Sequence, residues 1–302
     1  MRFRPLAHQS MAVSAISLRL DDRFERSAAG WSALVLAAVD CGINCFEISG
    51  RSPALVDGVG QALRTVERRL IFLAWRFGPS AMPVQYADSA YSPSGMAGLA
   101  RAVIARTGLD YLDLIQLDDP GAQDLSAEGL QTLKQMKAEG VARALGVAGQ
   151  GEEIDVYIST GAFDALTTPF NMLSGSRERR RIKAASDRNM SVMGYAYYPQ
   201  AMLAVTKAAK PKTGLLGWGG KRMSITPEPY AFLHTTSGWT AEEICLAYSL
   251  TEPALASVQI EPDNIVHLQA LAEVAERELP AGLPAQIEMS RFSGDVNQAR
   301  SA

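Results

Sequence analysis

The chain has 302 residues, of which 47% are hydrophobic and 20% charged, the balance of a soluble globular protein. Its net charge of −3 does not favour nucleic acid or an anionic membrane as a partner. We find neither a secretory leader nor a run of about 18 apolar residues, so we expect a cytoplasmic protein without membrane insertion. Three cysteines and three scattered histidines favour neither a disulfide framework nor a metal site.

Short apolar runs alternate with amphipathic stretches along the chain. We expect strands at 42–48, 70–77, 111–117, 143–148, 165–170, 191–197 and 257–260. We expect helices at 31–40, 55–69, 96–107, 126–139, 177–188, 240–249 and 265–277. This alternation predicts a parallel sheet, and its count of units favours a single (β/α)8 TIM-barrel domain over 1–302 rather than an open doubly wound sheet. The glycine fingerprint of the classical dinucleotide fold is absent.

Three segments depart from this rhythm. The stretch 78–95 is rich in Pro, Ser, Ala and Gly, and 208–240 holds several Gly and Pro residues, so both are expected to be loops. The second follows a barrel strand and should lie at the ligand-binding end, where it is a candidate switch. Its Trp218 and Trp239 are either packed side chains or exposed anchors for a partner. The polar tail 293–302 is expected to be flexible.

A basic run lies within the expected helix at 177–188. Its members are Arg177, Arg179, Arg180, Arg181 and Lys183. A run of this kind is usually a solvated helix face, and the alternative is a docking patch for a partner. The sequence leaves both interpretations open.

Five segments resemble, in order, signatures of the aldo-keto reductase family. They are 42–49 (GINCFEIS), 58–63 (GVGQAL), 71–78 (IFLAWRFG), 108–117 (GLDYLDLIQL) and 137–147 (KAEGVARALGV). Each is weak alone, but their order extends the resemblance over nearly the whole chain. The resemblance implies a barrel of the aldo-keto reductase type with a nicotinamide cofactor across its mouth.

The resemblance also locates a catalytic tetrad, and this sequence departs from it at every position. The family uses a Tyr acid, a Lys that an Asp orients, and a His that positions the carbonyl, while the nicotinamide supplies hydride. Glu47 stands for the Asp, Ser52 for the Tyr, Arg76 for the Lys and Asp118 for the His. Serine is a poor acid near neutral pH, and arginine does not release its proton there. We therefore expect a catalytically impaired member of the family.

Three interpretations of Glu47, Arg76 and Asp118 remain open. The first is an ion-pair network that replaced the lost site, because buried charges at a barrel mouth need partners. The second is a ligand-sensing site gated by the cofactor. The third is a rebuilt catalytic site, which would need Asp118 or Glu47 to carry a proton, and the neighbouring Arg76 disfavours that form.

Part of the cofactor site is matched. Tyr195 corresponds to the family's tyrosine that stacks on the nicotinamide, although it could equally be ordinary barrel filling. Tyr197 is expected to line the mouth. Ala148-Gly149 and Thr167 replace the Ser-Asn and Gln that hold the carboxamide, which removes polar contacts.

The segment 257–268 resembles the strand and loop that hold the adenosine end, and it gives the candidates Glu261, Asp263, Asn264 and His267. Members that use NADP place Lys and Arg where Glu261 and His267 stand. An acidic side chain repels a 2′-phosphate and accepts hydrogen bonds from a free ribose 2′-OH. We therefore expect NAD(H) to be preferred over NADP(H).

Three functions are compatible with these residues. The first is a redox-responsive regulator that binds NAD(H), similar to reductase-like proteins that control cell division. That resemblance implies a protein partner, either a division protein or a histidine kinase. The second is an active NAD(P)H-dependent oxidoreductase of carbonyl compounds that uses non-standard residues. The third is a scaffold without cofactor.

Overall fold

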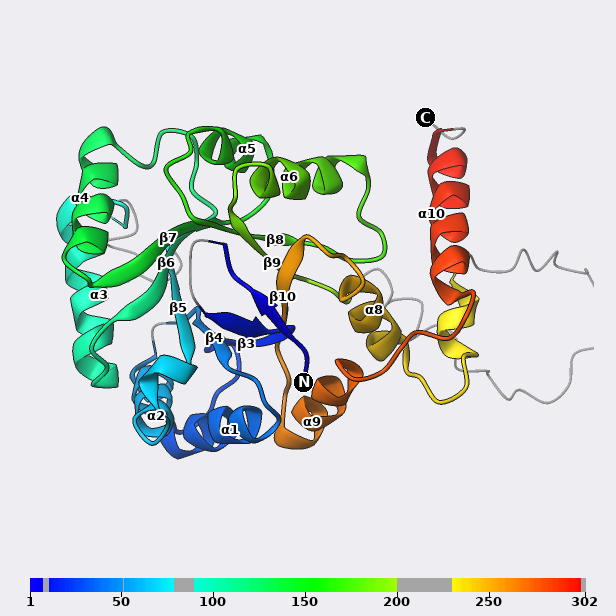
Figure 1. Cartoon of the computed structure of the whole chain (residues 1–302), viewed down its shortest axis with the longest axis horizontal. Coiled ribbons are helices and arrows are strands. Elements are labelled where there is room, and N and C mark those ends of the chain that lie inside the picture. The colour runs from blue at the N-terminus through cyan, green and yellow to red at the C-terminus, as the bar shows by residue number, and fades with distance from the viewer. Residues whose placement is uncertain (8–10, 51, 79–89, 200–229, 300–302) are drawn as a thin grey trace, which may run out of the picture.

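The computed structural model describes residues 1–7, 11–50, 52–78, 90–199 and 230–299, without the side chains of 292–299. Eight parallel strands close into a barrel, and helices surround it (Figure 1). The predicted (β/α)8 TIM barrel is therefore confirmed. In order around the barrel, the strands are β10 (Leu255–Ile260), β3 (Ile16–Leu20), β4 (Cys45–Ile48), β5 (Phe72–Phe77), β6 (Leu112–Asp118), β7 (Ala142–Ala148), β8 (Ala165–Pro169) and β9 (Ser191–Tyr195).

Most helices bury one face each against the outside of the sheet, whereas α10 stands at the side of the barrel, beyond α8 (Figure 1). They are α1 (Ala28–Asp40), α2 (Pro53–Leu63), α3 (Pro93–Thr107), α4 (Ala127–Ala138), α5 (Glu152–Ser159), α6 (Ser176–Ser186), α8 (Ala241–Ser249), α9 (Ile265–Val274) and α10 (Leu283–Ala299). Short 3₁₀ helices lie at η1 (Arg68–Leu70) and η4 (Ala231–His234). No helix in the described ranges is both long and apolar enough to cross a membrane.

Inside the barrel, the side chains change from apolar to polar along the strands. Residues two apart on a strand share a face, so every second side chain points inward. At the amino end, Cys45, Phe72, Leu114 and Met193 form an apolar cluster. Two residues further along the same strands stand polar side chains, such as Glu47 and Gln116. The strands therefore place a buried polar layer next to the carboxyl end of the barrel.

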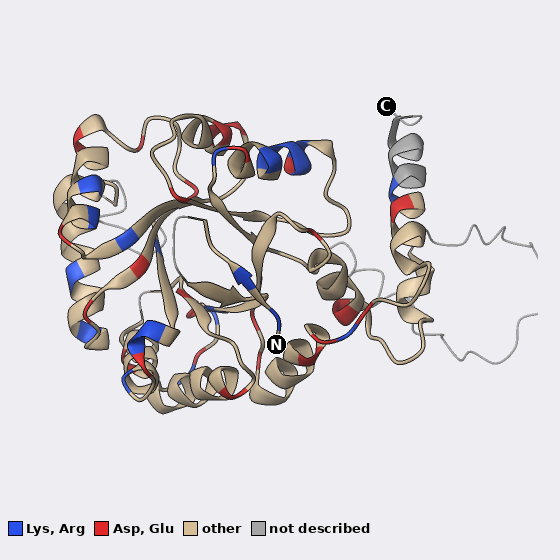
Figure 2. Cartoon of the chain, in the orientation of Figure 1, with Lys and Arg blue, Asp and Glu red and all other residues tan. Residues whose placement is uncertain are grey.

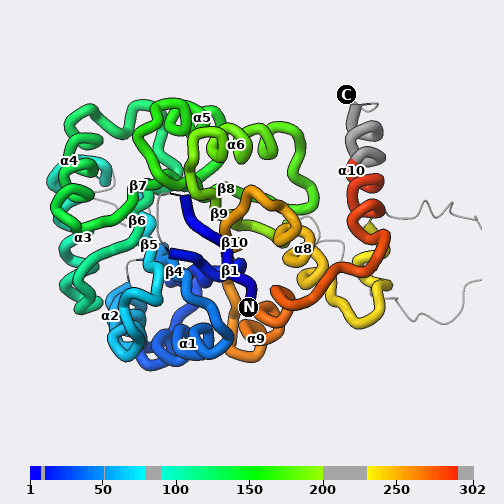
Figure 3. Tube along the Cα trace, in the orientation of Figure 1, coloured from blue at the N-terminus to red at the C-terminus, as the bar shows by residue number. Residues whose placement is uncertain are grey.

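A hairpin closes the opposite end. Strands β1 (Phe3–Pro5) and β2 (Ala12–Ser14) pair antiparallel and lie across the barrel, with the N-terminus beside α9 (Figure 3). Leu6 and Val13 belong to the apolar cluster there. The guanidinium of Arg4 donates to the carbonyls of Leu250 and Leu255, both at 2.5 Å. The beginning of the chain is thus fixed to the last strand of the barrel.

Most expected elements are present with shifted ends. The helix expected at 55–69 ends at Leu63 and is followed by η1, and the one expected at 96–107 begins at Pro93 after its N-cap Ser92. The expected loop at 78–95 is therefore shorter, and its residues 79–89 lie outside the described part. Strand β3, helix α5 and the hairpin were not anticipated.

Two further expectations concern the last third of the chain. Of the segment 208–240, residues 208–229, including Trp218, lie outside the described part, and η4 occupies part of the remainder. The segment 293–302 is helical as far as Ala299, within α10, where a flexible tail was expected.

The three cysteines are free thiols. Cys45 and Cys245 are buried, whereas Cys41 is partly exposed. Burial raises the pKa of Cys245 to about 12, so its thiol is protonated and unreactive near neutral pH.

Candidate functional site at the barrel mouth

The floor of the mouth is a buried ion pair. Glu47 from β4 and Arg76 from β5 face inward, with 1% and 3% of their surfaces exposed. The Nε of Arg76 lies 3.0 Å from Oε1 of Glu47, and its Nη1 lies 3.6 Å from Oδ1 of Asp118 at the end of β6. Three of the four predicted tetrad positions therefore meet in one network.

Two amide side chains donate further hydrogen bonds to the carboxylate of Glu47. Gln116 and Gln259 both donate from Nε2 to Oε2 of Glu47, at 2.6 and 2.8 Å. Thr167 in turn donates its hydroxyl to Oε1 of Gln116 at 2.6 Å. Thr167, a predicted cofactor residue, is therefore fully buried, and its hydroxyl is occupied by a hydrogen bond inside the barrel. The two glutamines were missed, although each interrupts an apolar strand, which is the signal that could have revealed them.

Arg19 on β3 is the second cation of the network and was also missed. Its Nε lies 3.7 Å from Oε1 of Glu47, and its Nη1 donates to Oε1 of Glu261 at 2.9 Å. Its Nη2 contacts Asp21 and donates to the hydroxyl of Ser49. Burial opposes the charge, but the carboxylates of Glu47, Glu261 and Asp21 raise the pKa of Arg19 above its ordinary value. Arg19 is therefore a permanent cation.

The tyrosines near the mouth are weak acids. The guanidinium of Arg76 lies 5.1 Å from the ring centroid of Tyr195, within the range of a cation–π contact. Burial raises the pKa of Tyr195 despite the nearby Arg76. Tyr91 donates its hydroxyl to the carbonyl of Asp118 at 2.5 Å, and burial raises its pKa as well. Neither phenol is prepared to donate a proton at neutral pH.

Ser52, at the predicted position of the acid, is not part of this network. It occupies the N-cap position of α2, although its side chain makes no capping bond. Its backbone N–H donates to Oδ2 of Asp22 at 2.8 Å.

Two residues at the ends of barrel strands have unusual backbone conformations. Asp119 after β6 has φ of 48°, and Ala196 after β9 has φ of 54°. Such values are uncommon for residues other than glycine and are often found near functional sites. Both flank the mouth, which supports the assignment of the site to this end of the barrel.

The predicted adenosine residues form a separate cluster at the rim. Asn264 is the N-cap of α9, because its Oδ1 accepts from the backbone N–H of His267 at 2.9 Å. The ring of His267 contacts Oδ1 of Asp263 at 2.8 Å, and this bond lowers the pKa of Asp263. On the other side, it contacts Glu242 at 3.2 Å, and Tyr197 donates its hydroxyl to the same carboxylate at 2.7 Å. Glu242 was not anticipated, and Tyr197 is buried beneath the rim.

The loop that carries Glu261 is less acidic than the sequence suggested. Glu261 is ion-paired with both Arg19 and Arg23. Arg26 donates to the backbone carbonyl of Asp263 at 2.5 Å. Three arginines from the first unit of the barrel therefore surround this loop, and they compensate much of the negative charge on which the expected NAD(H) preference was based.

Two hollows open near these groups. One, of about 540 Å³, is lined by Arg19, Asp21, Asp22, Arg23, Ser49, Gly50 and Asp118. The other, of about 450 Å³, lies between α8 and α9 and is lined by residues that include Tyr198, Trp239, Glu242 and His267. Within the described residues, no group of three His, Cys, Asp or Glu side chains is arranged to hold a metal ion.

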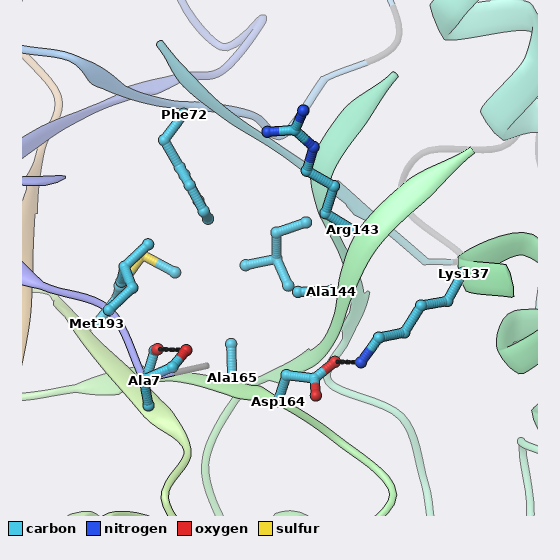
Figure 4. A pocket seen from close by; sticks show the side chains of 11 residues that line it. Ala7, Phe72, Lys137, Arg143, Ala144, Asp164, Ala165 and Met193 are labelled. Carbon is cyan, nitrogen blue, oxygen red and sulfur yellow. Dashed lines mark hydrogen bonds and ion pairs between the residues drawn. The ribbon is translucent and has the colours of Figure 1, made fainter. Parts of the chain in front are cut away.

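A smaller cavity, of about 100 Å³, lies at the opposite end of the barrel (Figure 4). Phe72, Ala144 and Met193 line it, and Lys137 and Asp164 form an ion pair of 2.7 Å at its edge. Barrel enzymes carry their chemistry at the carboxyl end of the strands, and residues at the amino end serve stability. We therefore assign the functional site to the mouth and not to this cavity.

The capping role of Asn264 can be separated from its predicted role in cofactor binding. We expect Asn264→Ala to lower the free energy of unfolding by about 1 kcal/mol, because α9 loses its N-cap acceptor. Asn264→Asp keeps the acceptor and should leave stability nearly unchanged. Urea unfolding measures both variants. Unchanged stability in Asn264→Ala, together with weaker NADH binding, would favour the cofactor role over the cap.

Comparison with known proteins agrees with this architecture. The model of the Aldo/keto reductase family matches residues 25–289. The chain belongs to the aldo/keto reductase family. Among solved structures, aldo-keto reductase AKR11C1 from Bacillus halodurans is similar in its holo and apo forms, with TM-scores of 0.73 and 0.71. Each is 18% identical and covers 96% of both chains, so the likeness shows the fold alone. No curated protein matches the chain.

Aldo/keto reductases bind nicotinamide dinucleotides, and two parts of this chain offer groups that suit the two ends of such a ligand. At the rim, the hollow beside Trp239 and His267 offers an aromatic wall and hydrogen-bonding groups suited to an adenosine. At the mouth, Tyr195 is half-buried and Asp118 lines the hollow. These groups fit a dinucleotide, although Arg76 already lies against the ring of Tyr195.

Proposed function

We propose that this aldo/keto reductase binds NAD(H) without the family's proton chemistry and acts as a redox-responsive regulator through protein–protein contacts. The observation that carries the proposal is the Arg76 guanidinium, which lies between Glu47 and Asp118 on the floor of the mouth. This pairing favours the first interpretation of the three residues, a structural network in place of a proton-transfer site.

Carbonyl reduction needs a hydride at carbon and a proton at oxygen. A bound NADH supplies the hydride. Ser52 and Arg76 stand where the family has its Tyr and Lys, and neither a serine hydroxyl nor an arginine releases a proton near neutral pH. Burial raises the pKa of the nearby Tyr195, which makes it a weaker acid. The dinucleotide would then be held by the rim and by Tyr195 without efficient turnover.

We propose NAD(H) over NADP(H), with a smaller difference than Glu261 alone would give. The carboxylate of Glu261 can accept from a ribose 2′-OH. Arg19 and Arg23 pair with it, so its repulsion of a 2′-phosphate is reduced. A modest preference in affinity is the expected result.

The partner is proposed to be a protein, either a division protein or a histidine kinase, by resemblance to the KidO type of reductase-like regulator. The net charge of −3 argues against nucleic acid. A cytoplasmic location is part of the same proposal, as is a response of the partner to the redox state of the cofactor.

A second candidate function is carbonyl reduction with unusual acids. Asp118 favours it, because 28% of its side chain is exposed at the edge of the mouth hollow. On this view Asp118 would supply the proton to the carbonyl oxygen, although its carboxylate already pairs with Arg76 at 3.6 Å.

Calorimetric titration with NADH, NAD⁺ and NADPH, followed by a panel of carbonyl compounds with NADH, tests the proposal. We expect NADH to bind more tightly than NADPH, with no turnover. Turnover that Asp118→Asn abolishes would establish the second candidate function. Absence of binding to any of the three dinucleotides would reject both functions and leave a scaffold.

A further inference from the structure

Lys and Arg gather on α6 (Figure 2), and two of the arginines contact neighbouring helices. Arg179 turns toward α8 and α10, where its Nη2 donates to the hydroxyl of Tyr248 at 2.8 Å and contacts Glu288. Arg181 turns toward α5, where its Nε lies 2.7 Å from Oδ1 of Asp155. Only 2% of the Arg181 side chain is exposed. These two arginines therefore join helices.

Arg177 and Arg180 of the same run border a groove between α5 and α6, together with Arg181 and with Arg188, which follows α6. The groove measures about 270 Å³ and is lined by Asp155, Ile158, Ser159, Arg177, Arg180, Arg181, Ala184 and Arg188. Ile158 and Ala184 give it an apolar part, while four guanidinium groups supply its charge. Every lining residue lies in the described part of the chain, on the outer shell and away from the barrel mouth (Figure 1).

The positive charge of the groove is only partly compensated. Arg177 is paired with Glu152 at 2.6 Å, and Arg181 with Asp155. Arg188, which follows α6, donates to the backbone carbonyl of Ala184 in that helix. Arg180 is exposed and has neither a hydrogen bond nor an ion pair with any residue that the structure describes. Two arginines thus remain without a carboxylate, in a chain whose net charge is −3.

The floor of the groove is preorganised. Besides its pair with Asp155, Arg181 donates from Nη2 to the backbone carbonyl of Gly151 at 3.0 Å, which fixes the guanidinium plane. Planar guanidinium groups match carboxylates with two parallel hydrogen bonds. The groove therefore combines a fixed cation, two uncompensated cations and an apolar contact between them.

We propose that this groove docks an acidic segment of a partner protein. Carboxylates of the segment pair with Arg180 and Arg188, and a small apolar side chain between them packs on Ala184, above the buried Ile158. The proposal rests on the proposed regulatory function, for which it supplies the partner surface, but docking itself does not require the dinucleotide. The net charge of −3 disfavours a long polyanion such as nucleic acid, so a short acidic peptide is the better match.

Fluorescence polarisation with the full chain tests this docking. The probe is a short synthetic peptide with glutamates around a central leucine, and its counterpart carries lysines instead. We expect the acidic peptide to bind, more weakly at high salt, and the basic peptide not to bind. In the double variant Arg180→Glu/Arg188→Glu, binding should fall by about tenfold or more, because two attractive contacts become repulsive.

The matched control is Arg101→Glu/Lys134→Glu, which changes the net charge equally at two exposed cations of α3 and α4. It should leave the affinity for the acidic peptide within about threefold, since neither residue lines the groove and exposed charges beyond direct contact are screened by salt. An equal loss in both variants, no binding of the acidic peptide to the wild type, or tighter binding of a single-stranded oligonucleotide overturns the proposal. NADH titration of the wild type and the variants distinguishes the two proposals. If the wild type does not bind NADH, the proposed regulatory function is rejected, but the proposed docking of an acidic segment is not.

Discussion

Replacing Glu47 with alanine is expected to destabilise the barrel by about 3–5 kcal/mol, the cost of removing one partner from a buried ion pair. Arg76 would lose its carboxylate partner at 3.0 Å and keep Asp118 at 3.6 Å and the side-chain oxygen of Gln259 at 3.5 Å. Gln116 and Gln259 would each lose the acceptor of a buried amide. Guanidinium chloride unfolding, with the free energy extrapolated to water, measures the effect.

Glu152→Ala is the control for this experiment. Glu152 also pairs with an arginine, but 82% of its side chain is exposed, so we expect a change of no more than about 1 kcal/mol. The double variant Glu47→Leu/Arg76→Met removes both charges together and should recover much of the loss, since apolar residues can replace a buried pair. A loss in Glu47→Ala no larger than in the control would show that the pair is not needed for stability.

Restoring the four residues of the family is expected to create a carbonyl reductase. The variant combines Glu47→Asp, Ser52→Tyr, Arg76→Lys and Asp118→His. We expect its kcat/KM for a reactive aldehyde with NADH to exceed that of the wild type by at least about 10²-fold, the lower range for a positioned general acid. Steady-state oxidation of NADH, followed by its absorbance, provides the measurement.

The triple variant that keeps Ser52 separates the acid from its neighbours. Without the phenol it should remain near the activity of the wild type, although its ion-pair network is changed in the same way. NADH binding is measured for both variants, so that a gain in affinity is not mistaken for a gain in chemistry. A wild type that already matches the restored variant would contradict the proposal that the proton donor is missing.

Much of the barrel could be predicted because its strands are buried on both faces and therefore form apolar runs. Strand β3 was missed since Arg19 divides its apolar residues, and helix α5 because it is only eight residues long. The local sequence reveals the hydrophobic periodicity of a helix or strand, but it does not reveal which other elements a short strand or helix packs against. The closed order of the strands supplied that information.

The candidate site was predictable only where a motif marked it. Glu47, Arg76 and Asp118 were found through the resemblance, and the structure brings them together as an ion-pair network. Arg19 and Glu242 belong to strands and helices far away in sequence, and no local pattern links them to their partners. For the same reason Glu261 looked like an isolated acid, although Arg23 compensates it.

The closure of the barrel has a consequence for synthesis of the chain. Strand β3 pairs with β4 on one side, but its other partner is β10, where Val258 lies opposite Ile16. While the ribosome extends the chain, β3 and β9 both present an unpaired edge until β10 emerges. Such edges can pair with another chain, so the nascent protein is open to aggregation during most of its translation. Closure between segments so distant also gives a high contact order, which predicts slow folding after release.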